Sequence, residues 1–249
     1  IALATCGSYI NKDTADKLKS AGVSALSFSI DAADPQKHDE FRGTKGAWKT
    51  VMDAISVVKN AGLKFQINTT ITKDNYNDIT QIAQLAVELG AGCFNPFVLV
   101  PMGRATGIVS KLLSPDQYKK TLNELLQLKR KLPITMRVTC GPQFAAIASS
   151  QGGPLTEHVP GCLAANGFVF ISAYGDVQTC GFLDISAGNL IDNGFDFAGI
   201  WESSELLNNI RDYKKYKAAC GKCKYILNCR GCRARSEEHT SELQSPNTI

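Results

Sequence analysis

The feature that most restricts the fold is the alternation of strand-like and helix-like segments over the first 140 residues. Short apolar runs typical of buried strands are separated by stretches in which apolar residues recur at helical spacing. The strand-like runs are IALAT, VSALSFSI, LKFQINTTIT and CFNPFVLV. This alternation predicts an α/β fold with a parallel sheet and helical crossovers, either an open doubly wound sheet or a barrel segment.

Four helices are predicted between and after these runs. The first covers Asp13 to Ser20, and the next two end at Gly62 and Gly90, where glycine is favoured just past a helix. The fourth begins at Ser114, which forms a capping box with Gln117. The chain also begins directly on a strand, so we expect that sequence preceding it is missing.

The alternation stops after about residue 141. Residues 141–160 are rich in Gly, Pro and Ser, which predicts a linker between two domains. FVFIS and DVQTC then form a hairpin-like pair around Tyr174, Gly175 and Asp176, and an amphipathic stretch leads to a cysteine cluster. The predicted organisation is an α/β domain at 1–140 and a small cysteine-rich domain at 161–234.

The nine cysteines favour a metal site over disulfides. Four lie within the thirteen residues of CGKCKYILNCRGC, and two-residue gaps allow successive thiolates to converge on one centre. A structural zinc ion needs four ligands and remains an alternative. Six or more cysteines in two groups fit iron–sulfur clusters better than a single zinc ion. The cysteines lie at positions 6, 93, 140, 162, 180, 220, 223, 229 and 232.

The sequence lacks the features of a membrane-spanning or secreted protein. The formal net charge is only +4, and no apolar run is long enough to span a bilayer. The start lacks the pattern of a signal peptide, so a cytoplasmic location is predicted. The positive excess gathers around the cysteines, where it either forms a solvated face, offsets an anionic metal–thiolate site or attracts a carboxylate-rich ligand. These cations are Lys214, Lys215, Lys217, Lys222, Lys224, Arg230 and Arg233.

The cysteine spacing resembles the SPASM extension of radical S-adenosylmethionine (radical SAM) enzymes, which binds auxiliary [4Fe-4S] clusters. The pattern here is Cys162-x12-Gly175-x4-Cys180, a gap, and then Cys220-x2-Cys223-x5-Cys229-x2-Cys232. The usual pattern has three residues between the last two clustered cysteines and a further cysteine after another gap. The resemblance implies one cluster on Cys220, Cys223 and Cys229, and another on Cys162, Cys180 and Cys232 with Cys140 as a possible fourth ligand.

The N-terminal half resembles the radical SAM partial (β/α)6 TIM-like barrel. SFSIDAADPQKHDEFRG is similar to its fourth strand and loop, QINTTIT to the fifth strand and FVLVPMGRA to the sixth, so strands three to six are expected. IALATCGS is then the third strand, and Cys6 is expected to be a plain buried cysteine. The resemblance implies cofactor contacts for Ser29, Asp31, Asn68 and Arg104, although strand capping by the first three is the structural alternative. His38 and His158 are expected to be polar surface residues.

GCLAANGFVFISAYGDVQTCGFLDISAGNL, CRGCRAR and VTCGP resemble the haem-biosynthesis branch, which includes 12,18-didecarboxysiroheme deacetylase and NirJ-like enzymes. This resemblance implies an enzyme that uses [4Fe-4S] clusters and S-adenosyl-L-methionine. A 5′-deoxyadenosyl radical would remove acetate side chains from an iron tetrapyrrole. Electrons would come from a ferredoxin or flavodoxin, and no nucleic acid or membrane partner is expected.

Two features predict that the chain is a fragment. The Cx3Cx2C motif that binds the catalytic cluster is absent, so the fragment itself is expected to be inactive. Loss of the first two barrel strands would expose an edge of the parallel sheet that is normally buried, so poor solubility is also expected. RSEEHTSELQS, from Arg235 to Ser245, matches the translation of a common sequencing adapter, which predicts that residues 235–249 are an artefact. Two other functions remain possible, a SPASM peptide-modifying maturase and a non-enzymatic, zinc-stabilised binding module.

Overall fold

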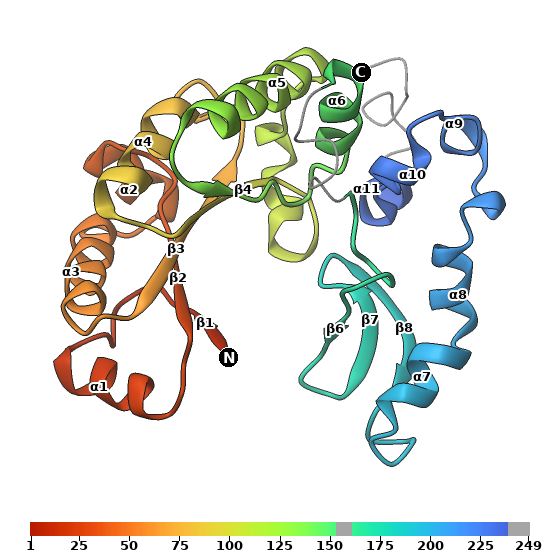
Figure 1. Cartoon of the computed structure of the whole chain (residues 1–249), viewed down its shortest axis with the longest axis horizontal. Helices are drawn as coiled ribbons and strands as arrows, with labels where there is room; N and C mark the ends of the chain where they lie inside the picture. The colour runs from red at the N-terminus through yellow and green to blue at the C-terminus, as the bar shows by residue number, and fades with distance from the viewer. Residues whose placement is uncertain (153–160, 239–249) are drawn as a thin grey trace. The chain divides into compact units, whose positions relative to one another are not determined.

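A computed structural model describes residues 1–152 and 161–238 (Figure 1). The chain divides into two compact units. The first consists of Ile1–Leu99 and Asn123–Thr139, and the second of Val100–Leu122 and the chain from Cys140 onward. Each unit has its own sheet, so the units are described separately below.

The first unit contains a five-stranded parallel sheet in the order β1-β2-β3-β4-β5 (Figure 1). The α/β prediction with a parallel partial barrel is therefore confirmed, and each of the four predicted strands is present. The fifth strand has only two residues, too few to produce a recognisable pattern in the sequence. The strands are β1 (Ala2–Ala4), β2 (Ala25–Ser29), β3 (Lys64–Ile71), β4 (Cys93–Val98) and β5 (Thr135–Met136).

The predicted helices are also present, and a further one was missed. In the predicted capping box, the Gln117 N–H donates to Ser114 Oγ and the Ser114 N–H donates to Gln117 Oε1. The missed helix, α2, has one buried residue, His38, and therefore lacks the apolar stripe that would reveal it. The helices are α1 (Lys12–Ser20), α2 (Pro35–Arg42), α3 (Ala47–Asn60), α4 (Ile79–Leu89) and α5 (Pro115–Lys131), the last of which contributes to both units.

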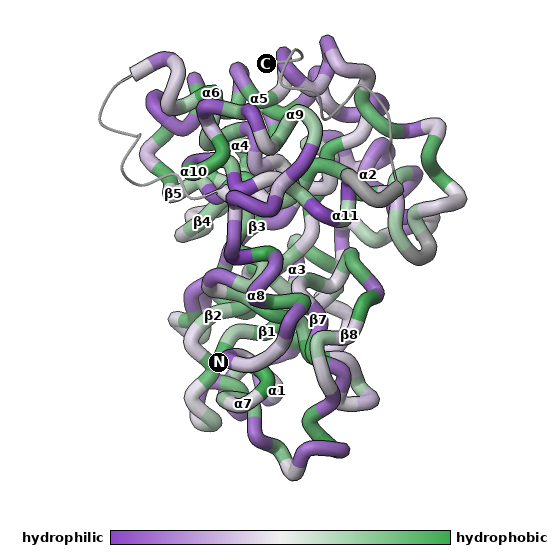
Figure 2. Tube along the Cα trace, turned by 90° about the vertical axis from the view of Figure 1, so that its right-hand side faces the viewer, coloured by the Kyte–Doolittle hydropathy of each residue, from purple (hydrophilic) through white to green (hydrophobic). Residues whose placement is uncertain are grey.

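The core of the first unit follows from the two-residue period of its strands. One face of β2 to β4 is apolar and buried, while the residues between them are only partly buried. Helices α3 and α4 contact these strands and contribute their own buried apolar stripes. Figure 2 shows the hydropathy of the described residues along the trace. The buried strand residues include Leu26, Phe28, Phe65, Ile67 and Phe94.

The second unit contains a three-stranded antiparallel sheet in the order β6-β7-β8 (Figure 1). The predicted hairpin corresponds to β6 (Phe170–Ile171) and β7 (Asp176–Cys180), and β8 (Leu183–Asn189) is an additional strand. Gly175 has φ of 86° in the connecting turn, a conformation that side chains disfavour. The remaining elements are η1 (Gly103–Lys111), α6 (Gln143–Gln151), α7 (Phe197–Ser203), α8 (Glu205–Arg211), η3 (Tyr213–Lys215), α9 (Ala218–Gly221), α10 (Ile226–Cys229) and α11 (Arg233–Glu238).

The segment predicted as a linker contains a buried helix. Residues 143–148 of α6 are all buried, and five of these six side chains are apolar, although Gly, Pro and Ser flank them. The predicted artefact also overlaps ordered structure, since Arg235 is buried within α11. Residues 153–160 and 239–249 lie outside the described part of the chain.

Among the described helices, none combines the length and apolar character needed to cross a bilayer.

Candidate functional site

Three polar side chains lie in one row across the open face of the parallel sheet. Ser29 on β2 is in register with Asn68 on β3, and Asn68 is in register with Asn95 on β4. All three are partly buried, on the face opposite the buried apolar residues. The Gln66 amide donates to Asn68 Oδ1 over 2.9 Å, and the Thr139 hydroxyl donates to Asn95 Oδ1 over 2.8 Å. This row offers donors and acceptors to a polar ligand.

Asp31 is also at the end of β2, but its side chain is completely buried. One carboxylate oxygen accepts the Thr70 N–H over 2.8 Å, and the other pairs with Arg42. Burial raises the pKa of the carboxyl group, whereas Arg42 and the Thr70 N–H act in the opposite direction. These contacts favour the structural role over cofactor contact, because both carboxylate oxygens have partners within the protein.

Of four other residues singled out in the sequence, two are placed differently from expectation and two have side chains outside the described residues. His38 was predicted at the surface and is buried, because the turn after β2 places its Nδ1 3.2 Å from the Asp31 N–H. Cys6 was predicted to be buried and is exposed, because β1 itself is exposed throughout. Arg104 belongs to η1, and its side chain is outside the described residues, as is the whole of His158.

The seven cysteines proposed as ligands all belong to the second unit and are all free thiols. Three of them, Cys140, Cys180 and Cys232, pack against the same small core. That core consists of Val100, Leu183 and Ala234, with Met102 and Phe182 beside it. Three positions far apart in the sequence are therefore brought together by the fold.

Electrostatic interactions connect these three thiols to Cys162. Burial raises the pKa of Cys140 to about 12, and Cys232, Cys180 and Cys162 each add to the increase. Burial also raises the pKa of Cys162 to about 11, with smaller increases from Cys232 and Cys180. The increases that come from neighbouring cysteines arise because a thiolate repels a further negative charge. We call Cys140, Cys162, Cys180 and Cys232 the inner thiol group.

The other three cysteines form a second neighbourhood. Burial raises the pKa of Cys229 to about 12, and Cys220 and Cys223 add to the increase, followed by Cys232. Between Cys229 and Cys232, Arg230 and Gly231 both adopt left-handed backbone conformations, with φ of 62° and 64°. We call Cys220, Cys223 and Cys229 the outer thiol group.

A close backbone contact joins the two groups. The Cys162 N–H donates to the Cys229 carbonyl over 3.0 Å. A Cβ atom on the preceding residue, Gly161, would lie 2.1 Å from the Asn228 carbonyl oxygen and 2.2 Å from that of Cys229. Only glycine fits in this position without moving the backbone, so Gly161 permits the approach of the two cysteine-bearing segments.

The donor set fits iron–sulfur clusters in chemistry, because four thiolates per cluster are the usual ligands. Among the described residues, however, no three His, Cys, Asp or Glu side chains are close enough together to hold a metal ion. The inner and outer groups are therefore neighbourhoods of thiols and not finished ligand sets. Binding of a cluster requires rearrangement of the thiols together with loss of their protons.

Aromatic and basic side chains surround the thiols. The hydroxyl of buried Tyr118 donates to Gln143 Oε1 over 2.6 Å. Burial raises the pKa of this hydroxyl, with further increases from Cys232, Cys229 and Cys140. The Arg233 guanidinium lies 3.8 Å from the centre of the Tyr216 ring. These groups place a hydrogen-bonding and cationic shell around sulfur atoms that would carry negative charge.

Sequence reasoning missed one member of the polar row, Asn95, and the hydrogen-bond partner of another, Gln66. A signal for both was present, because they alternate with buried apolar residues in LKFQINTTIT and CFNPFVLV. Tyr118 and Gln143 were not identified as neighbours of the cysteines. Their proximity depends on tertiary packing, for which the sequence contains no local pattern.

Comparison with protein families gives two matches. Residues 1–86 match the model described as the radical SAM superfamily, and residues 162–233 match SPASM, an iron–sulfur cluster-binding domain. The chain is 37% identical to an AdoMet-dependent heme synthase of Methanosarcina barkeri, over 97% of this chain and 71% of the relative. It is 36% identical to an enzyme of the same name from Nitratidesulfovibrio vulgaris, over 95% of this chain and 68% of the relative.

More distant relatives and solved structures agree on the architecture. The Fe-coproporphyrin III synthase of Methanosarcina barkeri is 27% identical, over 94% of this chain and 64% of the relative. Streptococcus suis SuiB bound to S-adenosylmethionine superposes with a TM-score of 0.71 at 18% identity, over 98% of this chain and 58% of that one. At this low identity the likeness to SuiB concerns the fold alone.

Proposed function

Since the chain belongs to the radical SAM superfamily and includes a SPASM domain, we propose that the whole protein modifies an iron tetrapyrrole in haem biosynthesis. The observation that carries this proposal is the 37% identity to an AdoMet-dependent heme synthase across almost the whole chain. Because the chain spans about 70% of that relative, activity is proposed for the whole protein. The proposed location is the cytoplasm.

The residues of the chain would prepare the site for this chemistry. When bound, S-adenosylmethionine and a [4Fe-4S] cluster would supply the radical chemistry that activates the substrate. Ser29 and Asn68, on the open face of the sheet, would form hydrogen bonds with the polar parts of the cofactor. Arg104 remains a candidate for binding a carboxylate group of the ligand.

Two tetrapyrrole reactions are compatible with the family. The sequence predicts removal of acetate side chains from 12,18-didecarboxysiroheme. The similarity to heme synthases instead favours formation of haem, which has vinyl groups at two positions where Fe-coproporphyrin III has propionates. Identity is higher with the heme synthase than with the Fe-coproporphyrin III synthase, 37% against 27%. We therefore place haem formation first and acetate removal second.

The thiol groups are proposed to hold auxiliary clusters. The inner group, Cys140, Cys162, Cys180 and Cys232, has the four thiols that one [4Fe-4S] cluster requires. The outer group has three, Cys220, Cys223 and Cys229, so a cluster there would need one further ligand. Packing of three inner thiols on one core and their mutual electrostatic interaction support this division.

The direct test is an anaerobic assay of the product of the intact gene, reconstituted with iron and sulfide. The enzyme would be incubated with S-adenosylmethionine, a reductant and either Fe-coproporphyrin III or 12,18-didecarboxysiroheme. Mass spectrometry would detect haem from the first substrate or loss of two acetates from the second. Failure to convert either tetrapyrrole by an enzyme that still cleaves S-adenosylmethionine would exclude the proposed substrate class.

A second candidate is peptide modification. The chain is 28% identical to the mycofactocin maturase MftC of Mycobacterium tuberculosis, over 93% of this chain and 58% of the relative. This identity is lower than that to the heme synthases, so peptide modification is the weaker proposal. The non-enzymatic zinc module loses its support, because both family matches are to proteins of iron–sulfur chemistry.

A further inference from the structure

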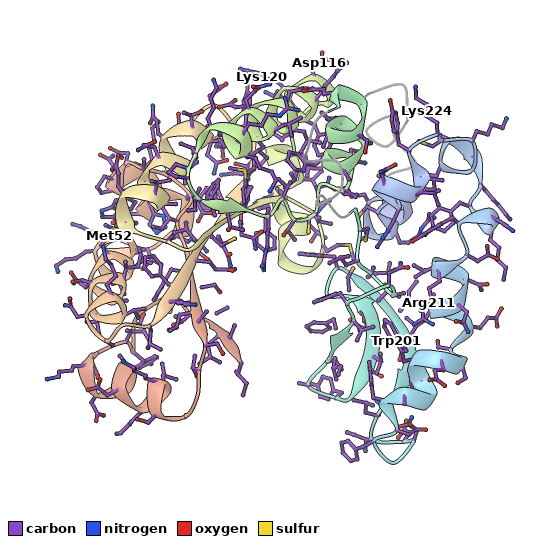
Figure 3. All side chains as sticks on the ribbon, viewed as in Figure 1. Met52, Asp116, Lys120, Trp201, Arg211 and Lys224 are labelled. Carbon is purple, nitrogen blue, oxygen red and sulfur yellow. The ribbon has the colours of Figure 1, made fainter. Side chains whose placement is uncertain are left out.

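Two side-chain amides of the polar row, those of Asn68 and Asn95, each have their oxygen engaged by a neighbouring residue. Gln66 and Asn68 are two residues apart on β3, so their side chains share one face of the sheet. The Gln66 amide nitrogen donates to Asn68 Oδ1 over 2.9 Å. The NH2 group of Asn68 is therefore the part of this amide that remains for a ligand. Figure 3 shows the side chains of the described residues as sticks, including those of β2, β3 and β4.

The same arrangement occurs at Asn95 on β4. The Thr139 hydroxyl donates to Asn95 Oδ1 over 2.8 Å. The backbone of Thr139 is held on both sides, because its N–H donates to the Pro96 carbonyl over 2.9 Å and its carbonyl accepts the Val98 N–H over 3.1 Å. A β-branched side chain on an anchored backbone has few rotamers, so the position of the hydroxyl is restricted. The NH2 group of Asn95 is then also left for a ligand.

The remaining donors of the row are accessible. Among the described residues, none accepts a hydrogen bond from the NH2 groups of Asn68 and Asn95, and none pairs with the Ser29 hydroxyl. These three groups are also not among the polar atoms that are buried without a partner, so each has surface that water or a ligand can reach. The row therefore presents three available donor groups on one face of the sheet.

The spacing of these donors suits a carboxylate group. Ser29, Asn68 and Asn95 are in register on adjacent strands, which are ~4.8 Å apart. A carboxylate has two acceptor oxygens and no donor, whereas a carboxamide would turn its own NH2 group towards one of the donors. Hydrogen bonds to an ionised acceptor are also stronger than those to a neutral one. The row should thus favour a carboxylate over the uncharged amide of the same molecule.

We propose that Gln66 and Thr139 are positioning residues, which hold the amides of Asn68 and Asn95 with their NH2 groups towards the open face so that the row selects a carboxylate. The identity of the ligand rests on the proposed function, in which S-adenosylmethionine and the tetrapyrrole both carry carboxylates. The orientation of the two amides rests on the hydrogen bonds alone.

The experiment measures carboxylate preference in the intact protein without added iron or sulfide, so that no cluster contributes to binding. Equilibrium dialysis compares S-adenosylmethionine with its decarboxylated form, and fluorescence titration compares coproporphyrin III with its tetraamide. Wild type is expected to bind the carboxylate form at least ~10-fold more tightly in one of these pairs, and that pair identifies the source of the carboxylate. Equal affinity within both pairs would overturn the proposal.

Two variants test the positioning residues. Thr139→Val removes the hydroxyl and keeps the shape, and Gln66→Met removes the donating amide. Each allows an asparagine amide to rotate, so the preference for the carboxylate is expected to fall at least ~3-fold. A merely structural defect would weaken binding of both members of a pair and leave their ratio unchanged. An unchanged ratio in both variants would show that neither residue positions the row.

A conservative variant and a matched control complete the set. Thr139→Ser keeps the hydroxyl and should restore the preference of wild type. Thr135→Val removes an exposed hydroxyl from β5 of the same sheet and should leave the preference within ~2-fold of wild type. Equal loss of preference in Thr135→Val and Thr139→Val would overturn the role of the Thr139 hydroxyl.

The outcomes separate this inference from the proposed function. A preference for S-adenosylmethionine that both variants reduce, with no binding of coproporphyrin III, would support the positioning role and count against a tetrapyrrole substrate. Conversion of a tetrapyrrole by an intact enzyme whose carboxylate preference is the same in wild type and in both variants would support the proposed function and exclude the positioning role.

Discussion

The carboxylate of Asp31 is completely buried at the end of β2 and forms an ion pair with Arg42 at the last position of α2. Replacement of Arg42 by alanine leaves this carboxylate without its cation. We expect Arg42→Ala to lower the free energy of unfolding of the chain by ~2–3 kcal/mol, measured by urea denaturation at neutral pH, because an uncompensated buried charge is costly.

An exposed ion pair of the same unit provides the control. Lys49 pairs with Asp53 one helical turn away, and both side chains are mostly exposed. Lys49→Ala should therefore change the free energy of unfolding by no more than ~0.5 kcal/mol. Similar losses in the two variants would show that Arg42 does not compensate a buried charge.

Buried His38 should make stability depend on pH. Burial, with a smaller effect of Arg42, lowers the imidazole pKa from 6.5 to about 4, and Asp39 opposes the change. His38 therefore binds a proton more readily in the unfolded chain than in the folded one. The contribution of neutral, buried His38 to folding stability is fully present above pH 6.5 and is lost as pH falls towards 4. The free energy of unfolding should fall by as much as ~3 kcal/mol over this range.

The variant His38→Gln isolates the effect, because its side chain can still accept the Asp31 N–H but does not titrate. Subtracting its unfolding free energy from that of wild type at each pH removes the other groups that titrate. A difference that stays constant between pH 7 and pH 4 would contradict the lowered pKa of His38.

Regular elements were predictable from the sequence, whereas buried polar contacts were not. The first four strands and the capping box at Ser114 have local patterns, either a period of two or a pair of residues at fixed spacing. The burial of His38 and Asp31 depends on how the turn after β2 folds back, which no local pattern encodes. For the thiols, the family resemblance implied the outer group and named Cys140 as a possible partner of Cys232. The proximity of Cys140 to Cys232 itself arises from packing on the core of Val100, Leu183 and Ala234.

Cys140 lies outside the SPASM match at 162–233, so its role can be tested separately. If Cys140 is the fourth inner ligand, Cys140→Ala should lower the iron and sulfide content of the reconstituted chain, by up to ~4 iron atoms per chain. It should also change the electron paramagnetic resonance spectrum of the reduced protein. Cys93→Ala, which removes a partly buried free thiol from β4, should alter neither.

Gly161 should be essential for the approach of Cys162 to Cys229. An alanine Cβ would lie 2.1 Å from a backbone carbonyl oxygen, and a backbone atom cannot move away as a flexible side chain can. We expect Gly161→Ala to cost at least ~2 kcal/mol of unfolding free energy and to reduce iron content, because it separates the inner and outer thiol groups. Gly167→Ala is the matched control, since its Cβ would meet no atom within 4 Å. Full cluster content in Gly161→Ala would show that binding of the clusters does not require this backbone contact.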